Sequence, residues 1–311
     1  MCGFCGFSGQ VMNREEVLHA MAERITHRGP DSDGYYIAGE HEDDSIAMGF
    51  RRLSIIDLER GNQPIYNEDK SLVLMFNGEI YNYRALRTEL IEKGHAFSTK
   101  TDSEVLLHGF EEWREELLTK LRGMFAFAIW NTVDHSLFIA RDYFGIKPMH
   151  YTKLPDGRII FASEIKCMAA HPDFVCEFNE QALDGYLSFQ YSVPPKTFFK
   201  NVYCLPPAHY LWYKNGEISE HRYWDPVFHP DNDMTLEDAV EEIDRAFTDS
   251  VEAHRISDVE VGCFLSSGVD SSYVASYFSG QKAFTVGFDN GSHYNESEYA
   301  SALAEHVGIE H

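Results

Sequence analysis

The most constraining feature of the sequence is a change of pattern at residues 224–233, where two prolines and three aspartates interrupt the hydrophobic periodicity. On its N-terminal side, strand-like segments and hairpins dominate, with a few helices between them. On its C-terminal side, predicted strands and helices alternate. A chain of 311 residues is also longer than most single hydrophobic cores allow. The sequence therefore predicts two domains, residues 1–225 and residues 226–311, joined by a linker.

The first predicted domain consists mainly of strands. Apolar residues at helical spacing predict helices over residues 12–25, 83–93 and 102–116. Strands are predicted over residues 124–130 and 136–141. Hairpin turns are predicted at residues 155–157 and 215–216, because Pro-Asp-Gly and Asn-Gly favour tight turns. Many strands with the helices set apart predict stacked sheets and helices, an α+β layer fold.

The second predicted domain begins with a helix start signal. Thr235 and Asp238 form a capping-box pattern ahead of an amphipathic helix. Beyond that helix we expect a strand over residues 260–265, a helix over 271–278, a strand over 283–288 and a helix over 297–307. This order predicts parallel strands and an α/β domain of the nucleotide-binding type. Because two strands cannot bury both faces of such a sheet, we expect this second domain to be incomplete.

The net charge and the cysteine content indicate which partners the protein can bind and in which compartment it is found. The chain has 26 Lys+Arg against 50 Asp+Glu, a formal charge of -24, which repels nucleic acid and anionic lipid. Six cysteines spread over the whole chain indicate a reducing cytoplasm rather than a disulfide scaffold. No signal peptide and no apolar run long enough to span a bilayer are visible. We expect a cytoplasmic protein without nucleic acid or membrane partners, and the sequence leaves a homodimer open.

Cys2, directly after the initiator methionine, is the most informative single residue. Removal of Met1 would place a free α-amino group, with an ordinary pKa of about 7.8, beside the thiol. A nucleophile and its general base can therefore belong to one residue. The alternative is a buried or redox cysteine, because Cys2 and Cys5 spell C-x-x-C. A zinc site would need a second close pair of cysteines, and we expect Cys5 to pack in the core.

A set of short motifs follows Cys2 in a fixed order. They are MCGFCGF at residues 1–7, HRGPD at 27–31, RLSIID at 52–57, NGEIYN at 77–82, TDSE at 101–104, GMFAF at 123–127, RD at 141–142 and GIKP at 145–148. Together they resemble the glutaminase domain of class II amidotransferases, specifically that of glutamine-hydrolysing asparagine synthetases. The resemblance implies an N-terminal-nucleophile αββα sandwich, an α+β fold.

The resemblance also implies roles for individual residues. Cys2 would attack the side-chain amide of glutamine and release ammonia, with the Asn77 side chain and the Gly78 backbone N–H as the oxyanion hole. Arg52 would bind the glutamine α-carboxylate, while Glu79 and Asp102 would hold the α-ammonium. The complete implied glutamine-binding set is Arg52, Leu53, Ser54, Ile55, Ile56, Asn77, Gly78, Glu79 and Asp102.

Several of these residues also have simpler explanations. Asn77-Gly78 is a favoured hairpin turn. Arg51 competes with Arg52 for the carboxylate, and only the match to Arg-Leu-Ser-Ile favours Arg52. Asp102 could cap the helix that follows it. The histidines show no metal-ligand spacing, so we expect them to be structural or surface residues.

A second motif, LSSGVDSS at residues 265–272, lies between a predicted strand and a predicted helix. Small residues there let backbone N–H groups surround an anion, and the motif lacks the Gly-Lys-Ser/Thr ending of a Walker loop. It resembles the pyrophosphate-binding loop of ATP pyrophosphatases. The implied ATP-binding residues are Leu265, Ser266, Ser267, Gly268, Asp270, Ser271 and Val286, with Asp270 reaching the phosphates through Mg²⁺. Ser267 replaces the commoner glycine and restricts φ.

The combined resemblance predicts an ATP-dependent carbon–nitrogen ligase with glutamine as nitrogen donor. Ammonia released at Cys2 would amidate β-aspartyl-AMP, made from aspartate and ATP, to give asparagine, glutamate, AMP and pyrophosphate. We expect these 311 residues by themselves to hydrolyse glutamine but to make no asparagine. One alternative is a related class II amidotransferase that amidates or cyclises another carboxylate. The other is a stand-alone N-terminal-cysteine amide hydrolase.

Overall fold

The computed structural model describes residues 1–41, 45–58, 60–278, 281–288 and 295–311. Its contacts divide the chain into two units, Met1–Val227 and Phe228–His311. The boundary between the units lies within residues 224–233, the segment at which the sequence pattern changes. Across the described ranges, every helix is too short or too polar to span a bilayer.

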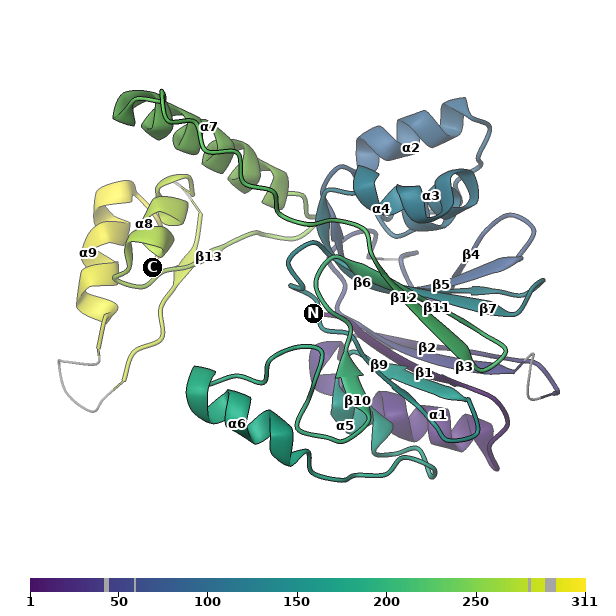
Figure 1. The fold of residues 1–311 in the computed structure, drawn as a ribbon. Helices are drawn as coiled ribbons and strands as arrows, with labels where there is room; N and C mark the ends of the chain where they lie inside the picture. The colour runs from purple at the N-terminus through teal and green to yellow at the C-terminus, as the bar shows by residue number, and fades with distance from the viewer. Residues whose placement is uncertain (42–44, 59, 279–280, 289–294) are drawn as a thin grey trace. The chain divides into compact units, whose positions relative to one another are not determined.

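Two six-stranded antiparallel sheets form the centre of the first unit (Figure 1). The first sheet has the strand order β10-β8-β9-β1-β3-β2. Its strands are β1 (Gly3–Ser8), β2 (Ser32–Ala38), β3 (Ile46–Arg52), β8 (His150–Lys153), β9 (Ile159–Ala162) and β10 (Val202–Cys204). The second sheet has the order β12-β11-β7-β6-β5-β4. Its strands are β4 (Ile65–Tyr66), β5 (Leu72–Ile80), β6 (Gly123–Asn131), β7 (Ser136–Arg141), β11 (His209–Lys214) and β12 (Glu217–Arg222).

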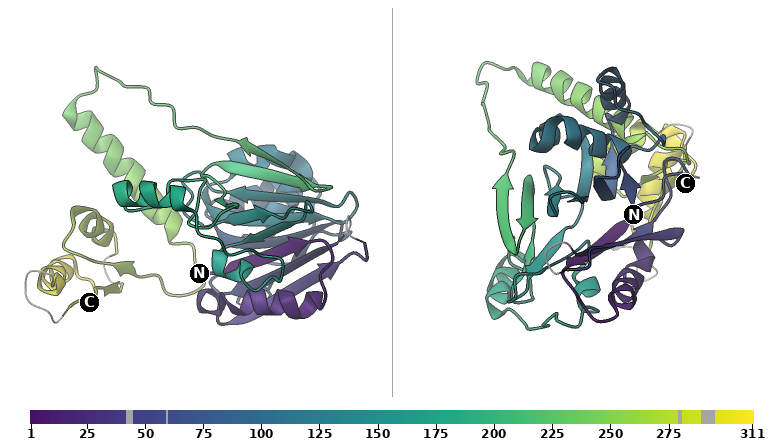
Figure 2. Two further views of the ribbon diagram at one scale, coloured as in Figure 1. Left: turned by 60° about the horizontal axis from the view of Figure 1, so that its bottom comes forward. Right: turned by 90° about the vertical axis from the view of Figure 1, so that its right-hand side faces the viewer.

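Helices cover the outer face of each sheet, so that the first unit has four layers (Figures 1 and 2). The helices beside the first sheet are α1 (Arg14–Glu23) and α5 (Ile165–Met168). The helices beside the second sheet are α2 (Tyr83–Glu92), α3 (Glu104–Trp113) and α4 (Leu117–Lys120). The remaining helical segments of this unit are α6 (Glu180–Phe189) and the 3₁₀ turns η1 (Thr26–Arg28) and η2 (Arg114–Glu116). This arrangement is the αββα sandwich that the sequence predicts.

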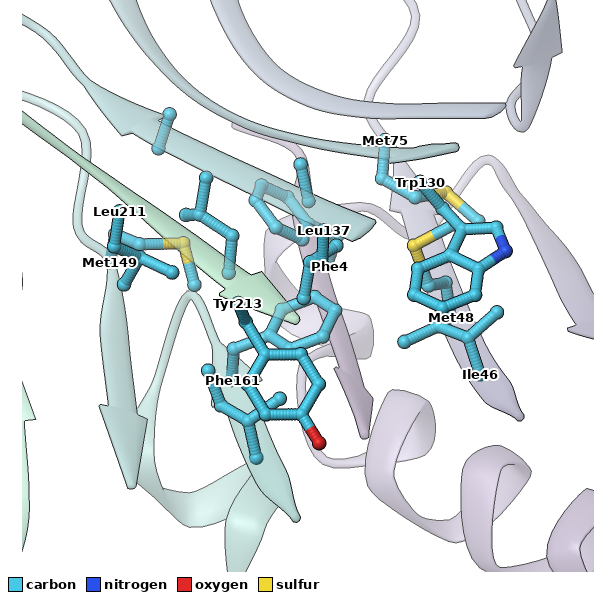
Figure 3. Close-up of a cluster of buried hydrophobic side chains, with 14 of the residues drawn as sticks. Phe4, Ile46, Met48, Met75, Trp130, Leu137, Met149, Phe161, Leu211 and Tyr213 are labelled. Carbon is cyan, nitrogen blue, oxygen red and sulfur yellow. The ribbon is translucent and has the colours of Figure 1, made fainter. Parts of the chain in front are cut away.

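The two faces of each strand bury different cores, because side chains alternate along a strand. In β1, Phe4 packs between the two sheets, whereas Cys5 and Phe7 pack toward α1. The inter-sheet core is continued by residues such as Phe50 of β3 and Met75 of β5. Figure 3 shows this layer, with the aromatic and sulfur-containing side chains interdigitated. The face on which a residue lies therefore decides whether it can reach the space between the sheets.

Most predicted elements of the first unit are present with small shifts. The predicted helices over residues 12–25, 83–93 and 102–116 correspond to α1, α2, and α3 with η2. The predicted strands and both hairpin turns are also present, with Asn215 and Gly216 at positive φ. Helix α6 was not predicted; its interior contains Gly185, and its side chains Leu187 and Phe189 are exposed. Its apolar pattern is therefore not that of a helix with one buried face.

In its described residues, the second unit contains a smaller parallel sheet and three helices. Its elements are α7 (Leu236–His254), β13 (Cys263–Phe264), α8 (Val269–Ser276), β14 (Ala283–Phe284) and α9 (Ser297–Val307). The predicted capping box at the start of α7 is confirmed, since Thr235 and Asp238 exchange side-chain to backbone hydrogen bonds. β13 and β14 pair in parallel as expected, but each has two residues and is shorter than predicted. A separate cluster that includes Leu265, Ala275 and Ala300 forms the core of this unit.

Candidate active site

Cys2 immediately precedes β1 and lies next to the loop that follows β3. Its Sγ accepts a hydrogen bond from the Leu53 N–H at 3.3 Å and lies 3.5 Å from the Leu53 carbonyl. Burial raises the pKa of the Cys2 thiol, and the hydrogen bond from Leu53 acts in the opposite direction. The Arg28 guanidinium donates to the Cys2 carbonyl at 2.9 Å. The thiol is thus fixed in place and favoured as the neutral form, so that it needs a base to become a nucleophile.

Cys2 and Cys5 lie on opposite faces of the first sheet. Cys2 packs against the inter-sheet core, whereas Cys5 is fully buried in the cluster beside α1. The prediction that Cys5 packs in the core is confirmed. A hydrogen bond with Cys167 and burial raise the pKa of the Cys5 thiol well above its usual value. The C-x-x-C spacing therefore does not form a redox pair, because residues three apart on a strand point in opposite directions.

The terminal amine beside Cys2 lies in a cationic environment. Burial lowers the pKa of the α-amino group, which belongs to Met1 here, and the nearby Arg28 and Lys147 lower it further while Cys2 raises it. Lys147 is itself almost fully buried, and its Nζ donates to the Met1 sulfur at 3.1 Å. Met1 remains 56% exposed. The Met1 amine is therefore shifted toward its neutral form.

Lys147 is presented by a tight loop after β7. The Asp142 carboxylate accepts hydrogen bonds from the backbone N–H groups of Ile146 and Lys147, both at 2.9 Å. The Arg141 guanidinium donates to the carbonyls of Gly145 and Lys147. Gly145 has φ +66°, and a Cβ there would lie 2.9 Å from the Arg141 guanidinium carbon. The RD and GIKP motifs therefore position Lys147 beside Met1, and the GIKP motif is the sequence signal for this lysine, which was not among the predicted site residues.

Asn77 and Gly78 lie inside β5 rather than at a turn. β5 pairs with β6 over its whole length, with Asn77 opposite Ala126 and Gly78 opposite Phe125. A Cβ at Gly78 would lie 2.2 Å from the Met124 carbonyl oxygen, so only glycine fits there. The hairpin-turn alternative is wrong, because the strand continues through both residues.

The Asn77 side chain lies on the face of β5 that points between the sheets, as Met75 does. It is 1% exposed, and its Nδ2 has no hydrogen-bond partner among the residues that the structure describes. A buried amide without a partner costs about 1–3 kcal/mol. Such a donor is available to a ligand that offers an acceptor, which is what an oxyanion does.

The register of the first sheet separates Arg52 from Arg51. Arg51 pairs with Gly3 in the β1–β3 ladder, and its side chain lies on the α1 side, with Nη1 3.1 Å from the Asp33 carboxylate. Arg52 lies on the opposite face, the one that Phe50 shares with the inter-sheet core. It is 6% exposed. Arg52, and not Arg51, can therefore face the same space as Cys2 and Asn77.

The Arg52 guanidinium is held by the loop that follows β3. It donates to the carbonyls of Ile56, Asp57 and Leu58 at 2.7–3.2 Å. The same loop is anchored at its other end, where the Ser54 N–H donates to the Asp31 carboxylate at 2.8 Å. Residues 53–56, the remaining predicted glutamine-binding residues, thus lie between the Cys2 sulfur and the Arg52 guanidinium.

Glu79 and Asp102 form a carboxyl pair in which Glu79 is half-buried and Asp102 is buried. Glu79 follows Asn77 on the same face of β5, and Asp102 is 4% exposed. Burial, and then the charge of Asp102, raise the pKa of Glu79 to about 8. Burial also raises the pKa of Asp102, although its carboxylate accepts the Ile80 N–H at 2.9 Å. Because two neighbouring carboxylates repel each other, this pair holds a proton when no cation is bound.

The capping role considered for Asp102 is not seen. Helix α3 has Ser103 as its N-cap residue, and no described side chain makes a capping hydrogen bond there. The Asp102 carboxylate instead binds the end of β5 through the Ile80 N–H. It therefore joins the α3 layer to the strand that carries Asn77 and Glu79.

The loop of residues 265–272 belongs to the second unit. Ser266 and Ser271 share a hydroxyl hydrogen bond of 2.8 Å, and the Ser266 Oγ accepts the Gly268 N–H at 3.2 Å. Gly268 is the N-cap of α8 and has no side chain to cap that helix end, while the neighbouring Ser267 N–H donates to the Glu296 carboxylate at 3.4 Å. Asp270 lies exposed in the first turn of α8. Small residues and an uncapped helix N-terminus are what an anion-binding loop requires.

Ser267 does not need the backbone freedom of glycine in this structure. It is absent from the described residues with positive φ, so its backbone is in a region that serine adopts without strain. Leu265 and Val286 lie at the ends of β13 and β14, where the Leu265 N–H donates to the Phe284 carbonyl. Leu265 is buried, whereas Val286 is 70% exposed.

Comparisons with known proteins match the two units separately. Residues 1–224 match the family described as a glutamine amidotransferase domain. Residues 242–311 match the family described as asparagine synthase.

Curated relatives and solved structures were compared as well. The glutamine-hydrolyzing asparagine synthetase 1 of Bacillus subtilis is 44% identical and covers 100% of this chain and 49% of its own length. The enzyme numbered 3 from the same organism is 36% identical over 90% of this chain and 45% of its own length. The chain therefore spans about half the length of these relatives. A B. subtilis glutamine phosphoribosylpyrophosphate amidotransferase structure gives a TM-score of 0.53 at 16% identity, covering 99% of this chain and 65% of that one, which shows a common fold.

Proposed function

The chain belongs to the glutamine amidotransferase family, and from this premise we propose that residues 1–225 hydrolyse glutamine at Cys2 and that residues 226–311 begin an ATP-binding domain that uses the ammonia. The observation that carries the proposal is the space between the two sheets. β3, β5 and the adjoining loops carry the Cys2 thiol, the buried Arg52 guanidinium, the Glu79–Asp102 carboxyl pair and the Asn77 Nδ2, which has no partner among the described residues.

The proposed attack uses groups from two strands. With Met1 removed, the Cys2 α-amine takes the thiol proton, and the Sγ forms a bond to the amide carbon of glutamine. The negative charge on the amide oxygen is met by the Asn77 Nδ2 and the Gly78 N–H, and one such donor is typically worth about 3 kcal/mol. The C–N bond then breaks and the proton passes to the departing nitrogen, which leaves as ammonia. Water hydrolyses the remaining thioester to glutamate.

Recognition of the substrate uses opposite charges at its two ends. The Arg52 guanidinium is proposed to bind the α-carboxylate, as its planar donor pair favours. The Glu79–Asp102 pair is proposed to bind the α-ammonium, whose charge replaces the proton that the pair holds in the free protein. Glutamine thus adds a second cation to the charge of Lys147, which already lowers the pKa of Glu79.

The second half-reaction is proposed for the loop of residues 265–272. The uncapped N-terminus of α8 and the small residues before it would bind the pyrophosphate portion of ATP. Mg²⁺, when bound, would neutralise the phosphate charge, and the exposed Asp270 carboxylate is suited to hold it. By likeness to the asparagine synthetases, the proposed acceptor is aspartate activated as β-aspartyl-AMP, with asparagine, AMP and pyrophosphate as products.

The proposed compartment is the cytoplasm. All six cysteines are free, and Cys2 must stay a thiol for the proposed chemistry, which a reducing compartment ensures.

Covalent labelling tests the nucleophile. The protein is incubated with an electrophilic glutamine analogue, and the adduct is located by intact and peptide mass spectrometry. We expect one adduct on Cys2 of protein that has lost Met1. Cys2→Ala should not be labelled, whereas Cys176→Ala, which removes an exposed cysteine, should be labelled as the parent is. Equal labelling of Cys2→Ala, or full glutaminase activity with Met1 retained, would contradict the proposal.

A further inference from the structure

Four side chains that the proposed function does not use converge beside α3. They are Glu68, His95, His108 and Glu111, and each offers one ligand atom within 4.8 Å of the other three. Glu68 lies in the turn after β4, His95 in the loop between α2 and α3, and the other two on α3 itself. Histidine spacing along the sequence did not reveal this group, because its members come from three separate segments.

The separations between the ligand atoms suit a small ion. His108 Nδ1 lies 3.0 Å from a Glu111 oxygen and 3.5 Å from a Glu68 oxygen. His95 Nδ1 lies 3.7 Å from the same Glu111 oxygen. Ligands of a tetrahedral Zn²⁺ ion with bonds of 2.0–2.2 Å are roughly 3.3 Å apart. The four side chains could therefore close around one ion with small movements.

Each carboxylate is anchored by one oxygen and presents the other. The Ala96 N–H donates to Glu68 Oε1 at 3.0 Å, which leaves Oε2 as the oxygen nearest His108. The Asn67 amide donates to Glu111 Oε1 at 2.8 Å, which leaves Oε2 between the two histidines. The inward oxygens are thus held in place by donors outside the cluster.

In both histidines, the Nε2 atom points away from the cluster and lies near a carboxylate outside it. His108 Nε2 is buried without a hydrogen-bond partner among the described residues and lies 3.6 Å from Glu104. Glu104 itself accepts four hydrogen bonds from Ser98 and Thr99. His95 Nε2 lies 3.6 Å from Glu112. Histidines that ligate metals generally donate their other N–H to a carboxylate, which fixes the tautomer that leaves the ligating nitrogen free.

We propose that Glu68, His95, His108 and Glu111 bind one Zn²⁺ ion. Two neutral imidazoles and two carboxylates neutralise a divalent charge, and nitrogen and carboxylate oxygen are ligands that zinc prefers. His108 is 1% exposed, whereas Glu68 is exposed, so that an ion can enter from the surface. The site is independent of the proposed glutaminase and ATP sites.

A zinc ion here would join three segments of the α2–α3 layer. The loop that carries His95 continues to Asp102, which binds the end of β5. Zinc would therefore stabilise the layer that supports the carboxyl pair without contacting it. A closed set of four protein ligands is typical of structural rather than catalytic zinc.

The test measures zinc retention by untagged protein. Chelator-treated chain is given one equivalent of Zn²⁺ and then a chromophoric chelator that competes for it. We expect the parent protein to retain one equivalent and to gain thermal stability with zinc. His95→Ala and Glu68→Gln change partly exposed or exposed ligands and should still fold. Each should weaken zinc binding by more than the roughly 10–100-fold caused by loss of an outer partner, and should lose the zinc-dependent shift in melting temperature.

Two matched controls separate this site from others. His306→Ala removes an exposed histidine of α9 and should retain zinc as the parent does. Cys2→Ala should also retain it, because the proposed site contains no sulfur. If the parent protein does not retain zinc, the proposal is wrong. The four side chains would then form only an ion-pair network between His108 and the neighbouring carboxylates. Equal retention by His95→Ala, or loss only in Cys2→Ala, would overturn the proposal as well.

Discussion

The proposed glutamine site and the loop of residues 265–272 differ in their surroundings. In the first unit, Arg52, Asn77 and Asp102 are at most 6% exposed and lie between two complete sheets and their loops. In the second unit, residues 267–270 are all exposed beside a sheet of two short strands. In the first site, the Asn77 Nδ2 has no partner among the residues that the structure describes, and the pKa values of Glu79 and Asp102 are raised. The loop satisfies its own hydroxyls through Ser266 and Ser271.

The difference in burial determines which kinds of interaction each site can offer a ligand. A site enclosed between layers has little water, so charges interact strongly and an unmet donor remains unmet until a ligand arrives. An exposed loop offers mainly backbone N–H groups and the end of a helix dipole. We therefore expect single substitutions to have large effects in the first site and small effects in the second.

The largest expected effect is that of Asn77→Ala. Loss of the proposed oxyanion donor should lower kcat for glutamine hydrolysis by about 10²–10³-fold with little change in KM. Because the Asn77 amide is buried without a described partner, the substitution should cost little or no stability. Steady-state kinetics and thermal melting measure both quantities. A variant that loses stability but keeps its kcat would show that Asn77 is structural.

Next in size is the contrast between Arg52→Gln and Arg51→Gln. Hydrogen bonds to charged groups contribute about 1.5–3 kcal/mol, so Arg52→Gln should raise KM for glutamine roughly 10–100-fold. Arg51 lies on the α1 side of the sheet near Asp33, so Arg51→Gln should leave KM close to that of the parent. Initial rates measured at several glutamine concentrations give the KM of each variant and show which arginine binds the substrate. Similar KM values for the two variants would contradict the assignment by strand face.

A smaller, pH-dependent effect is expected at Glu79. Burial and Asp102 raise its pKa from 4.5 to about 8, so the neutral form stabilises the free protein fully below about pH 4.5, and that contribution is lost as the pH rises through about 8. Below pH 8, binding of the glutamine α-ammonium must also release this proton. KM should therefore rise by about fivefold between pH 8 and pH 7.

Glu79→Gln is the matched variant for this pH dependence. It should unfold with less pH dependence between pH 4.5 and 8 than the parent, because it removes the titrating group. Its KM should be high but nearly independent of pH. Denaturant melts and KM measured across this range test both expectations, and an unchanged pH profile in Glu79→Gln would assign the proton to another group.

The smallest effect is expected for Ser267→Gly. Ser267 is not among the described residues with positive φ, so glycine relieves no backbone strain there. The added flexibility of glycine should lower the stability of the loop by roughly 0.5–1 kcal/mol at most. Binding of MgATP, measured by calorimetry, should change by less than about fivefold. A larger gain in affinity would show that the loop must adopt a backbone conformation that serine resists.

Local patterns in the sequence were sufficient for much of the fold. The capping box at Thr235, the Asn-Gly turn at residues 215–216 and the helix over residues 297–307 depend on neighbouring residues, and all are present. The short motifs identified the family and proposed the site residues. Strand lengths in the second unit were overestimated, because β-structure depends on partners that local sequence does not specify.

The sequence alone was sufficient for several helices and hairpins, for the division into two parts and for the candidates Cys2 and Asn77. Only the tertiary structure decided on which face each candidate lies: it separated Arg52 from Arg51, Cys2 from Cys5, and a continuous strand from a turn at Asn77. It also gathered Glu68, His95, His108 and Glu111. The physical reason is that side-chain direction alternates at every residue of a strand, so that pairing register and layer packing, which involve distant residues, fix what each side chain can reach.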